Sequence, residues 1–136
     1  HAEHVERVVG REVLEALPRG EPIHMLNLLR FRDVADYAHA PALASEEATS
    51  GREAYALYMR EMQPLLEASG GEVLFSGSAS GFLIGPQDET WDHVLLVRQA
   101  GKAAFLAFAS DPAAQTITAH RTAAIADSRL LPIRAD

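Results

Sequence analysis

The residue whose type and setting most suggest chemistry is Asn27. Its side-chain amide lies inside the apolar run 22–31, and its neighbours on the same face of a strand are Met25, Leu29 and Phe31. An amide buried there without hydrogen-bond partners costs about 1–3 kcal/mol, so it must find some. It could point into a pocket, where it would orient a substrate carbonyl or stabilise an enolate. Alternatively, it bridges to a backbone group at a strand irregularity.

His120 and Arg121 are the other candidate catalytic residues. They follow one another in a predicted helix over 112–126 and flank the stripe expected to be buried. That stripe is expected to run through Ala113, Ile117 and Ala124. A histidine suits proton transfer near neutral pH, and an arginine can hold a carboxylate through two hydrogen bonds. The structural alternatives are a histidine bonded to a backbone carbonyl and an arginine paired with an acid.

Four further side chains are candidates for contacting a ligand: Tyr55, Tyr58, Trp91 and His93. The tyrosines lie on the expected inner stripe of one helix, and alternation along strand 90–99 places Trp91 and His93 on one face. Each has a plainer interpretation, because aromatic side chains more often fill a core or a subunit interface. His24 falls on the strand face opposite Asn27 and joins neither group.

No metal or other cofactor is expected. The six histidines form no H-x-H, H-E-x-x-H or Glu-x-x-His pattern, and the chain has no cysteine. A haem would need an axial histidine, for which His120 is the one candidate, and this alternative is less favoured. The glycines of segment 77–81 lack the following helix and lysine of a phosphate-binding loop.

The elements that must position these residues follow from periodicity and from turn and cap residues. They are a leading helix with Val5, Val8, Val9, Leu14 and Leu17, strands at 23–31, 72–84, 90–99 and 129–133, and helices at 50–69, 101–110 and 112–126. Residues 85–89 form the turn of a hairpin. The order predicts an α+β fold, the ferredoxin-like βαββαβ arrangement with an extra N-terminal helix. We expect one domain over 1–136, in which a leading helix and loop (residues 1–21) precede a core (residues 22–133).

Two local signals stand out among these elements. Ser50 and Glu53 form a capping box at the start of the second helix, and Gly70 with Gly71 ends it in the left-handed conformation. Segment 32–49 lacks periodicity and is longer than ordinary connections, so we expect it to be mobile or to order as a lid.

Composition excludes several classes of function. A net charge of −7 and a pI near 5.3 argue against nucleic acid as a partner. No apolar run approaches the roughly 18–20 residues of a membrane span, so no membrane partner is expected. The charged start of the chain does not read as a signal peptide, and a cytoplasmic location is expected.

Strand 22–31 and the run 94–97 are apolar on both faces, although two helices can cover only one face of a small sheet. The other face is therefore expected to pack on a second copy of the chain, which predicts a homodimer. Seven short motifs, spread in order along the chain, together carry a family resemblance. They are Met25-Leu-Asn-Leu-Leu-Arg-Phe31, Gly51-Arg-Glu-Ala-Tyr55, Leu83-Ile-Gly-Pro86, Trp91-Asp92, Ala104-Phe-Leu106, Ser110-Asp-Pro112 and His120-Arg-Thr-Ala123.

With these motifs, the stretch from residue 22 to residue 133 resembles the uncharacterised DUF-1330 family. That family is similar to the dimeric α/β-barrel superfamily, so the resemblance implies two four-stranded antiparallel sheets packed face to face. Superfamily relatives include cofactor-independent monooxygenases, some with an asparagine on the first strand, which is where Asn27 lies in this sequence. The resemblance itself carries no assigned reaction.

Two functions follow as hypotheses. The chain is a small-molecule enzyme that performs cofactor-independent oxygenation or proton transfer on an organic acid or carbonyl compound, or it is a non-catalytic dimeric module that binds a small organic ligand. The enzyme hypothesis expects Asn27, His120 and Arg121 to converge on one pocket. If backbone groups satisfy these side chains instead, the binding module is favoured.

Overall fold

The structure is a computed structural model that describes residues 10–136. Residues 10–16 are helical, whereas Val5, Val8 and Val9 of the expected leading helix lie outside the described residues. The remaining elements are β1 (Ile23–Phe31), the short 3-10 helix η1 (Pro41–Leu43), α2 (Gly51–Ala68), β2 (Glu72–Ser78), β3 (His93–Gln99), α3 (Lys102–Ser110), α4 (Pro112–Ala124) and β4 (Ile125–Ile133). No helix among the described residues is long and apolar enough to cross a membrane.

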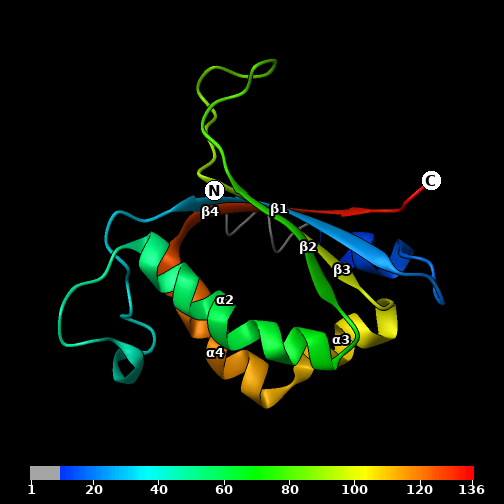
Figure 1. The fold of residues 1–136 in the computed structure, drawn as a ribbon, viewed down its shortest axis with the longest axis horizontal. Helices are drawn as coiled ribbons and strands as arrows, with labels where there is room; N and C mark the ends of the chain where they lie inside the picture. The colour runs from blue at the N-terminus through cyan, green and yellow to red at the C-terminus, as the bar shows by residue number, and fades with distance from the viewer. Residues whose placement is uncertain (1–9) are drawn as a thin grey trace.

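The four strands form one antiparallel sheet in the order β2-β3-β1-β4. Helices α2 and α4 lie side by side along one face of this sheet, and α3 lies at their far end (Figure 1). The order of elements is that of the predicted βαββαβ arrangement, and β1 lies in the middle of the sheet beside β3. The fold is therefore α+β, with the helices confined to one side.

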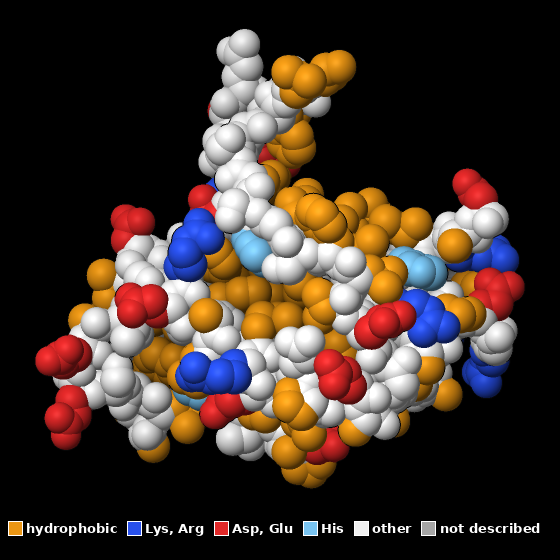
Figure 2. Space-filling model, in the orientation of Figure 1, with side chains coloured by type: hydrophobic (Ala, Val, Ile, Leu, Met, Phe, Trp, Pro, Cys, Tyr) orange, Lys and Arg blue, Asp and Glu red, His pale blue; other side chains and the backbone are white. Residues whose placement is uncertain are grey.

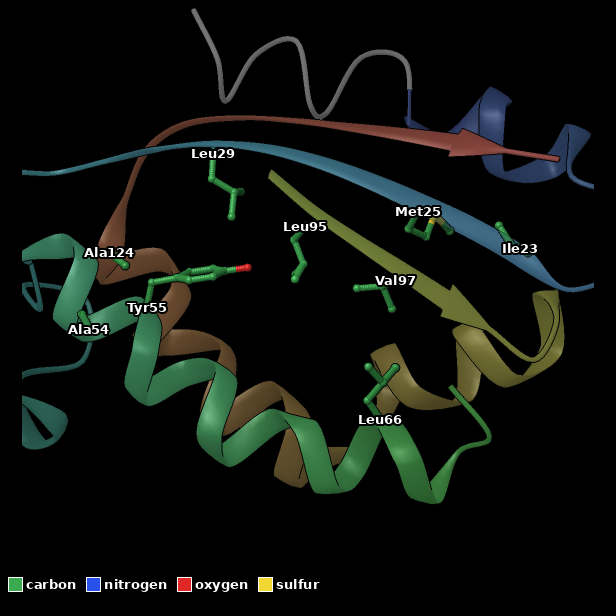
Figure 3. Packing of buried hydrophobic residues seen from close by; sticks show 9 residues of the cluster. All are labelled: Ile23, Met25, Leu29, Ala54, Tyr55, Leu66, Leu95, Val97 and Ala124. Carbon is green, nitrogen blue, oxygen red and sulfur yellow. The ribbon is translucent and has the colours of Figure 1, made fainter. Parts of the chain in front are cut away.

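The core lies between the sheet and the helices (Figure 3). The inner face of the sheet, as we name the side that the helices cover, contributes Ile23, Met25, Leu29, Leu95 and Val97, all buried. These residues alternate with outward-pointing ones along β1 and β3, as a pleated strand requires. Burying such side chains stabilises the fold by about 1.5–3 kcal/mol each, which is why this face is so strongly specified.

Both ends of α2 are formed as the sequence predicted. The Ser50 side chain accepts a hydrogen bond from the Glu53 backbone, and the Glu53 carboxylate accepts one from the Ser50 backbone. At the other end Gly70 has a φ of 87°, and the Gly71 amide donates to the Leu66 carbonyl. Only a residue without a Cβ adopts this left-handed conformation at little cost, so the helix ends here.

Gly51 is required for a different reason, namely close packing at the junction of β1, α2 and α4. Its amide donates to the carbonyl of Arg32, whose own amide donates to the carbonyl of Ala124. A Cβ at position 51 would lie 2.6 Å from the Ala124 oxygen and closer still to the Arg32 oxygen. The first residue of α2 can therefore approach the ends of β1 and α4 only as glycine.

The predicted hairpin of strands 72–84 and 90–99 is shorter than expected. β2 ends at Ser78 and β3 begins at His93, and the residues between them form an arm, residues 79–92, that leaves the sheet (Figure 1). A single bridge between Gly81 and Thr90 is the only ladder pairing within it. The apolar residues near position 83 predicted a continued strand, but no other strand or helix of the described chain covers them, so the pairing stops.

At the other end of the chain, α4 stops at Ala124 and β4 starts at Ile125 rather than at residue 129. The Ala124 carbonyl accepts from Arg32, which fixes the point where the chain turns from helix to strand. Segment 32–49 runs beside this junction, where the Asp36 amide donates to the Ala123 carbonyl. Its mobility stays a prediction, and its position is at the end of the helix layer.

Candidate functional site

A pocket of about 400 Å³ lies among the three helices beneath the sheet. Its lining is mostly apolar and comes from α2, α3 and α4: Tyr58, Met62, Phe105, Phe108, Ala109, Ala114, Gln115, Thr118 and Arg121. The volume falls in the range typical of small-molecule sites. Its polar lining consists of one guanidinium group, one amide and two hydroxyl groups, so the charge in the pocket wall is that of Arg121.

Arg121 lines this pocket together with Ala114 and Thr118, which precede it by seven and three residues and so share its side of α4. The sequence placed the buried stripe through Ala113, but Ala113 is exposed and Ala114 is buried, so the helix is rotated relative to that prediction. The Arg121 side chain makes no ion pair and no hydrogen bond with another residue in the described part of the chain. It is half-buried and has no acidic partner among those residues.

Tyr55 and Tyr58 of α2 lie close to this cation. Their ring centroids are 5.4 Å apart, and the Tyr55 ring points from α2 toward Leu95 (Figure 3). Burial raises the pKa of both hydroxyls above the ordinary value, and the nearby charge of Arg121 acts in the opposite direction on both. Neither hydroxyl bonds to another described residue, and the raised pKa values keep both neutral, so both are available as hydrogen-bond donors.

His93 extends this aromatic group toward the edge of the sheet. Its ring lies 5.9 Å from that of Tyr55 and 6.0 Å from that of Phe31, and its Nε2 is 3.0 Å from the Ser76 hydroxyl. Desolvation lowers the pKa of His93, and the charge of Arg52 lowers it further. His93 is therefore neutral at pH 7. Hydrophobic side chains fill the middle of this side of the molecule, between sheet and helices (Figure 2).

Asn27 lies on the inner face, but its amide is already engaged. Its Nδ2 donates to the carbonyls of Met25 and Leu95, each at 3.3 Å. Leu95 is its partner in the regular β1–β3 ladder, so the bond does not need the strand irregularity that the sequence suggested. Asn27 does not line the pocket with Arg121, and its geometry is that of the structural alternative.

His120 also lies away from the pocket. It is only 6% exposed, and its Nδ1 is 2.8 Å from the Tyr37 hydroxyl while its Nε2 is 3.5 Å from the Glu61 carboxylate. Tyr37 also packs edge-on against the imidazole ring, with centroids 5.6 Å apart. Sequence patterns assigned no role to Tyr37 or Glu61, because the first lies in an aperiodic segment and the second on the polar side of α2. Asn27 and His120 therefore do not meet.

Trp91 and His93 do not share a face as the sequence predicted. His93 lies under the inner face, whereas the buried Trp91 ring is stacked between the guanidinium groups of Arg30 and Arg129, each 5.0 Å from the indole. Its Nε1 donates to Glu89. The alternation of strand residues does not extend to position 91, because β3 begins only at His93.

Of the seven sequence-predicted residues, the structure thus brings together Tyr55, Tyr58 and Arg121, with His93 adjoining them. Arg52 and Ser76 belong to the same group and were missed, since nothing in the local pattern distinguishes an exposed helical arginine or a strand serine. Within residues 10–136, no three histidine or acidic side chains gather closely enough to hold a metal ion. The pocket itself offers the Arg121 cation, which pairs with no described residue, and the Tyr58 hydroxyl; Tyr55 adjoins Tyr58, and the neutral imidazole of His93 adjoins Tyr55.

No family model matches the chain, and no curated protein matches it. Among solved structures it is similar to the methylated RPA0582 protein, with 39% identity and a TM-score of 0.81 over 95% of this chain and 90% of that one. It is also similar to the RPA0582 protein of unknown function from Rhodopseudomonas palustris, with 40% identity and a TM-score of 0.78 over 94% and 92%. A dimeric protein of unknown function and ferredoxin-like fold from Bacteroides fragilis matches at 12% identity and a TM-score of 0.46 over 87% and 100%. Given the near-complete overlap at about 40% identity, this chain belongs to the family of the RPA0582 protein.

Proposed function

We propose that the chain binds a small organic acid with an apolar body in the pocket among α2, α3 and α4. The observation that carries this proposal is Arg121, a cation that lines an apolar pocket and has no acid partner in the described part of the chain. A half-buried charge is costly unless it is paired, so a carboxylate that enters the pocket gains the whole interaction. The neutral hydroxyl of Tyr58, which also lines the pocket, supplies a further donor beside it.

Binding is favoured over catalysis by Asn27 and His120. The Asn27 Nδ2 and both ring nitrogens of His120 have protein partners, and neither residue lines the pocket, so two of the three expected catalytic groups are engaged elsewhere. Proton transfer is the second candidate function, because His93 is a neutral imidazole beside Tyr55 and would accept a proton. Cofactor-independent oxygenation of an enolisable acid would need the same base.

We also propose that two copies pair through the sheet face that the helices leave uncovered, as in the dimeric α/β-barrel superfamily, and that the chain is a DUF-1330 member. Support comes from the sequence motifs and from the half-buried apolar residues Leu26, Leu28, Val94 and Leu96 on that face. A soluble monomer does not usually present so many apolar side chains on one face of a sheet.

The binding proposal is tested with a panel of saturated and aromatic carboxylates of roughly six to ten carbon atoms, a size that suits the pocket volume, and with alcohols of the same length. Titration calorimetry is run on the wild type, on Arg121→Met and on Arg60→Met. Arg60 is an exposed arginine of α2 that lies outside the pocket and serves as the matched control.

We expect the wild type to prefer acids over alcohols, and Arg121→Met to weaken acid binding by about 10- to 100-fold, the value of a charge-assisted hydrogen bond. Arg60→Met should bind as the wild type does. Equal affinity for acids and alcohols, or an Arg121→Met variant with unchanged affinity, would contradict the proposal.

A further inference from the structure

The arm, residues 79–92, carries the most exposed large apolar side chains of the described chain. Leu83 is 100% exposed and Ile84 is 91% exposed, and Phe82 beside them is also exposed. The arm projects from the sheet on the side opposite the helices, and hydrophobic side chains run along it to its tip (Figures 1 and 2). Contiguous apolar groups of this kind mark an interaction site on a stable protein.

The base of the arm is fixed by hydrogen bonds and cation–π contacts, whereas its tip is exposed to solvent. Both Arg30 Nε and Arg30 Nη2 donate to the Thr90 carbonyl, at 3.2 and 3.0 Å. Trp91 is clamped between Arg30 and Arg129, and the Asp92 carboxylate accepts from the Phe31 amide at 2.9 Å. These contacts tie the arm to β1 and β4 and set its direction. An arm ordered in advance loses little entropy when its tip binds.

The outer face of the sheet, the side away from the helices, is apolar beside this base. Phe75 of β2 is 60% exposed and Leu131 of β4 is 57% exposed, and both stand in register with outward-pointing partners of the central strands, Leu96 and Leu26. Ile133 continues the row at the end of β4. Arm and apolar face therefore lie on the same side of the molecule.

We infer that the arm is a clasp for a second copy of this chain: the outer faces of two copies meet, and the tip of each arm closes over the flank of the other copy. The inference rests on the proposed pairing of sheets and adds the arm to it. The exposed fractions at the tip and on the outer face equal about four fully exposed large side chains, roughly 700 Å² per copy. A standard interface buries about 800 Å² per partner.

Charge favours a second copy over a charged partner. The arginines around the outer face already have acidic partners within the chain: Arg30 and Arg129 share Asp127, at 3.6 and 2.7 Å, and Arg98 lies 3.9 Å from Glu72. Arginines that already have acidic partners offer little to nucleic acid or to a charged peptide, whereas apolar contact needs no counter-charge. A face and an arm on one side are also self-complementary, because a two-fold axis brings each arm to the other copy.

The test is sedimentation equilibrium of the full chain, from nanomolar to high micromolar concentration, on the wild type and three variants. The double variant Leu83→Asp/Ile84→Asp places charges at the tip, and Phe75→Asp places one on the outer face. Leu106→Asp is the control, since Leu106 is an exposed leucine in α3, on the helix side. Circular dichroism and thermal denaturation check that each variant is folded.

We expect a wild-type dimer, a dissociation constant raised at least 100-fold in the tip variant and in Phe75→Asp, and no change in Leu106→Asp. If the tip variant dimerises as tightly as the wild type while Phe75→Asp does not, the clasp is wrong and the pairing of sheets stands. A wild type that is monomeric throughout overturns both. If a face variant does not fold, Phe75→Ser replaces it, with a smaller rise in the same direction.

Discussion

His120 and Arg121 are neighbours in the chain, yet they lie in regions of opposite character. His120 is buried among partners from two other segments, the Tyr37 hydroxyl and the Glu61 carboxylate. Arg121, one residue later and about 100° round the helix, faces an apolar pocket and pairs with no described residue. The same helix thus holds one polar group that is satisfied and one that is not.

The difference separates a structural role from a binding role. A polar group with hydrogen-bond partners restrains the segments that it joins, and its removal leaves those partners without a hydrogen bond. An unsatisfied cation contributes nothing to the fold and is retained at a cost, which is the condition under which a ligand gains most. The distinction between a structural and a binding role is tested by the variants below, in order of decreasing expected effect on stability.

Replacement of His120 should cost far more stability than replacement of Arg121. We expect His120→Ala to lower the free energy of unfolding by about 2–3 kcal/mol, because it removes a buried side chain and leaves the Tyr37 hydroxyl and the Glu61 carboxylate without their partner. Arg121→Met should change it by less than about 0.5 kcal/mol or raise it slightly, since an apolar chain then fills an apolar pocket. Urea denaturation measures both changes, and equal losses in the free energy of unfolding would contradict the distinction between the two residues.

A smaller effect is expected from the hydroxyl of Tyr37. Tyr37→Phe keeps the ring packed against His120 but removes one hydrogen bond, so the free energy of unfolding should fall by about 1 kcal/mol. Amide exchange in segment 32–49 should become faster. Tyr58→Phe is the matched control, because its hydroxyl has no described partner and its loss should be neutral. The opposite ranking of the two variants would show that the pocket, not His120, restrains the fold.

The smallest effect concerns His93, the histidine on the inner face of the sheet. Its pKa is lowered by desolvation and then by Arg52, so the unfolded chain binds the proton more tightly than the folded one. Stability should therefore fall as the pH drops from the unfolded value of about 6.5 toward the lower folded pKa, and His93→Gln should flatten this slope. Above that window His93 has no effect.

The titration of His93 by NMR gives the direct reading. Its midpoint should lie below about 6.5 and should rise in Arg52→Gln, while Arg60→Gln on the same helix leaves it unchanged. A midpoint at or above the ordinary value would mean that the imidazole of His93 is solvated as it would be on the surface.

Sequence patterns predicted the regions of this fold that depend on near neighbours. The capping box of Ser50 and Glu53 and the left-handed Gly70 were confirmed, because both depend on residues within one helical turn. The order of strands and helices along the chain was confirmed too, because the period of apolar residues within each segment indicates its type. The extent of β2 was wrong, since a strand continues only where another segment pairs with it, and residue 83 has none.

For the candidate site, the sequence identified candidate residues but not the directions in which their side chains point. Tyr55, Tyr58 and Arg121 came together, whereas Asn27 and His120 found partners elsewhere. A rotation of α4 by a fraction of a turn decides which of two neighbours faces the pocket, and periodicity in a helix rich in alanine and threonine is too weak to set it.

By itself, the sequence determined the class of fold, the ends of α2 and the apolar inner face, because these follow from local backbone preferences and from the period of apolar residues. Only the tertiary structure decided that Tyr37 reaches His120 across 83 positions, that Arg121 pairs with no described residue, and that the arm stands on the outer face. Those outcomes depend on which distant groups come into contact, and contact between distant residues has no local pattern to reveal it.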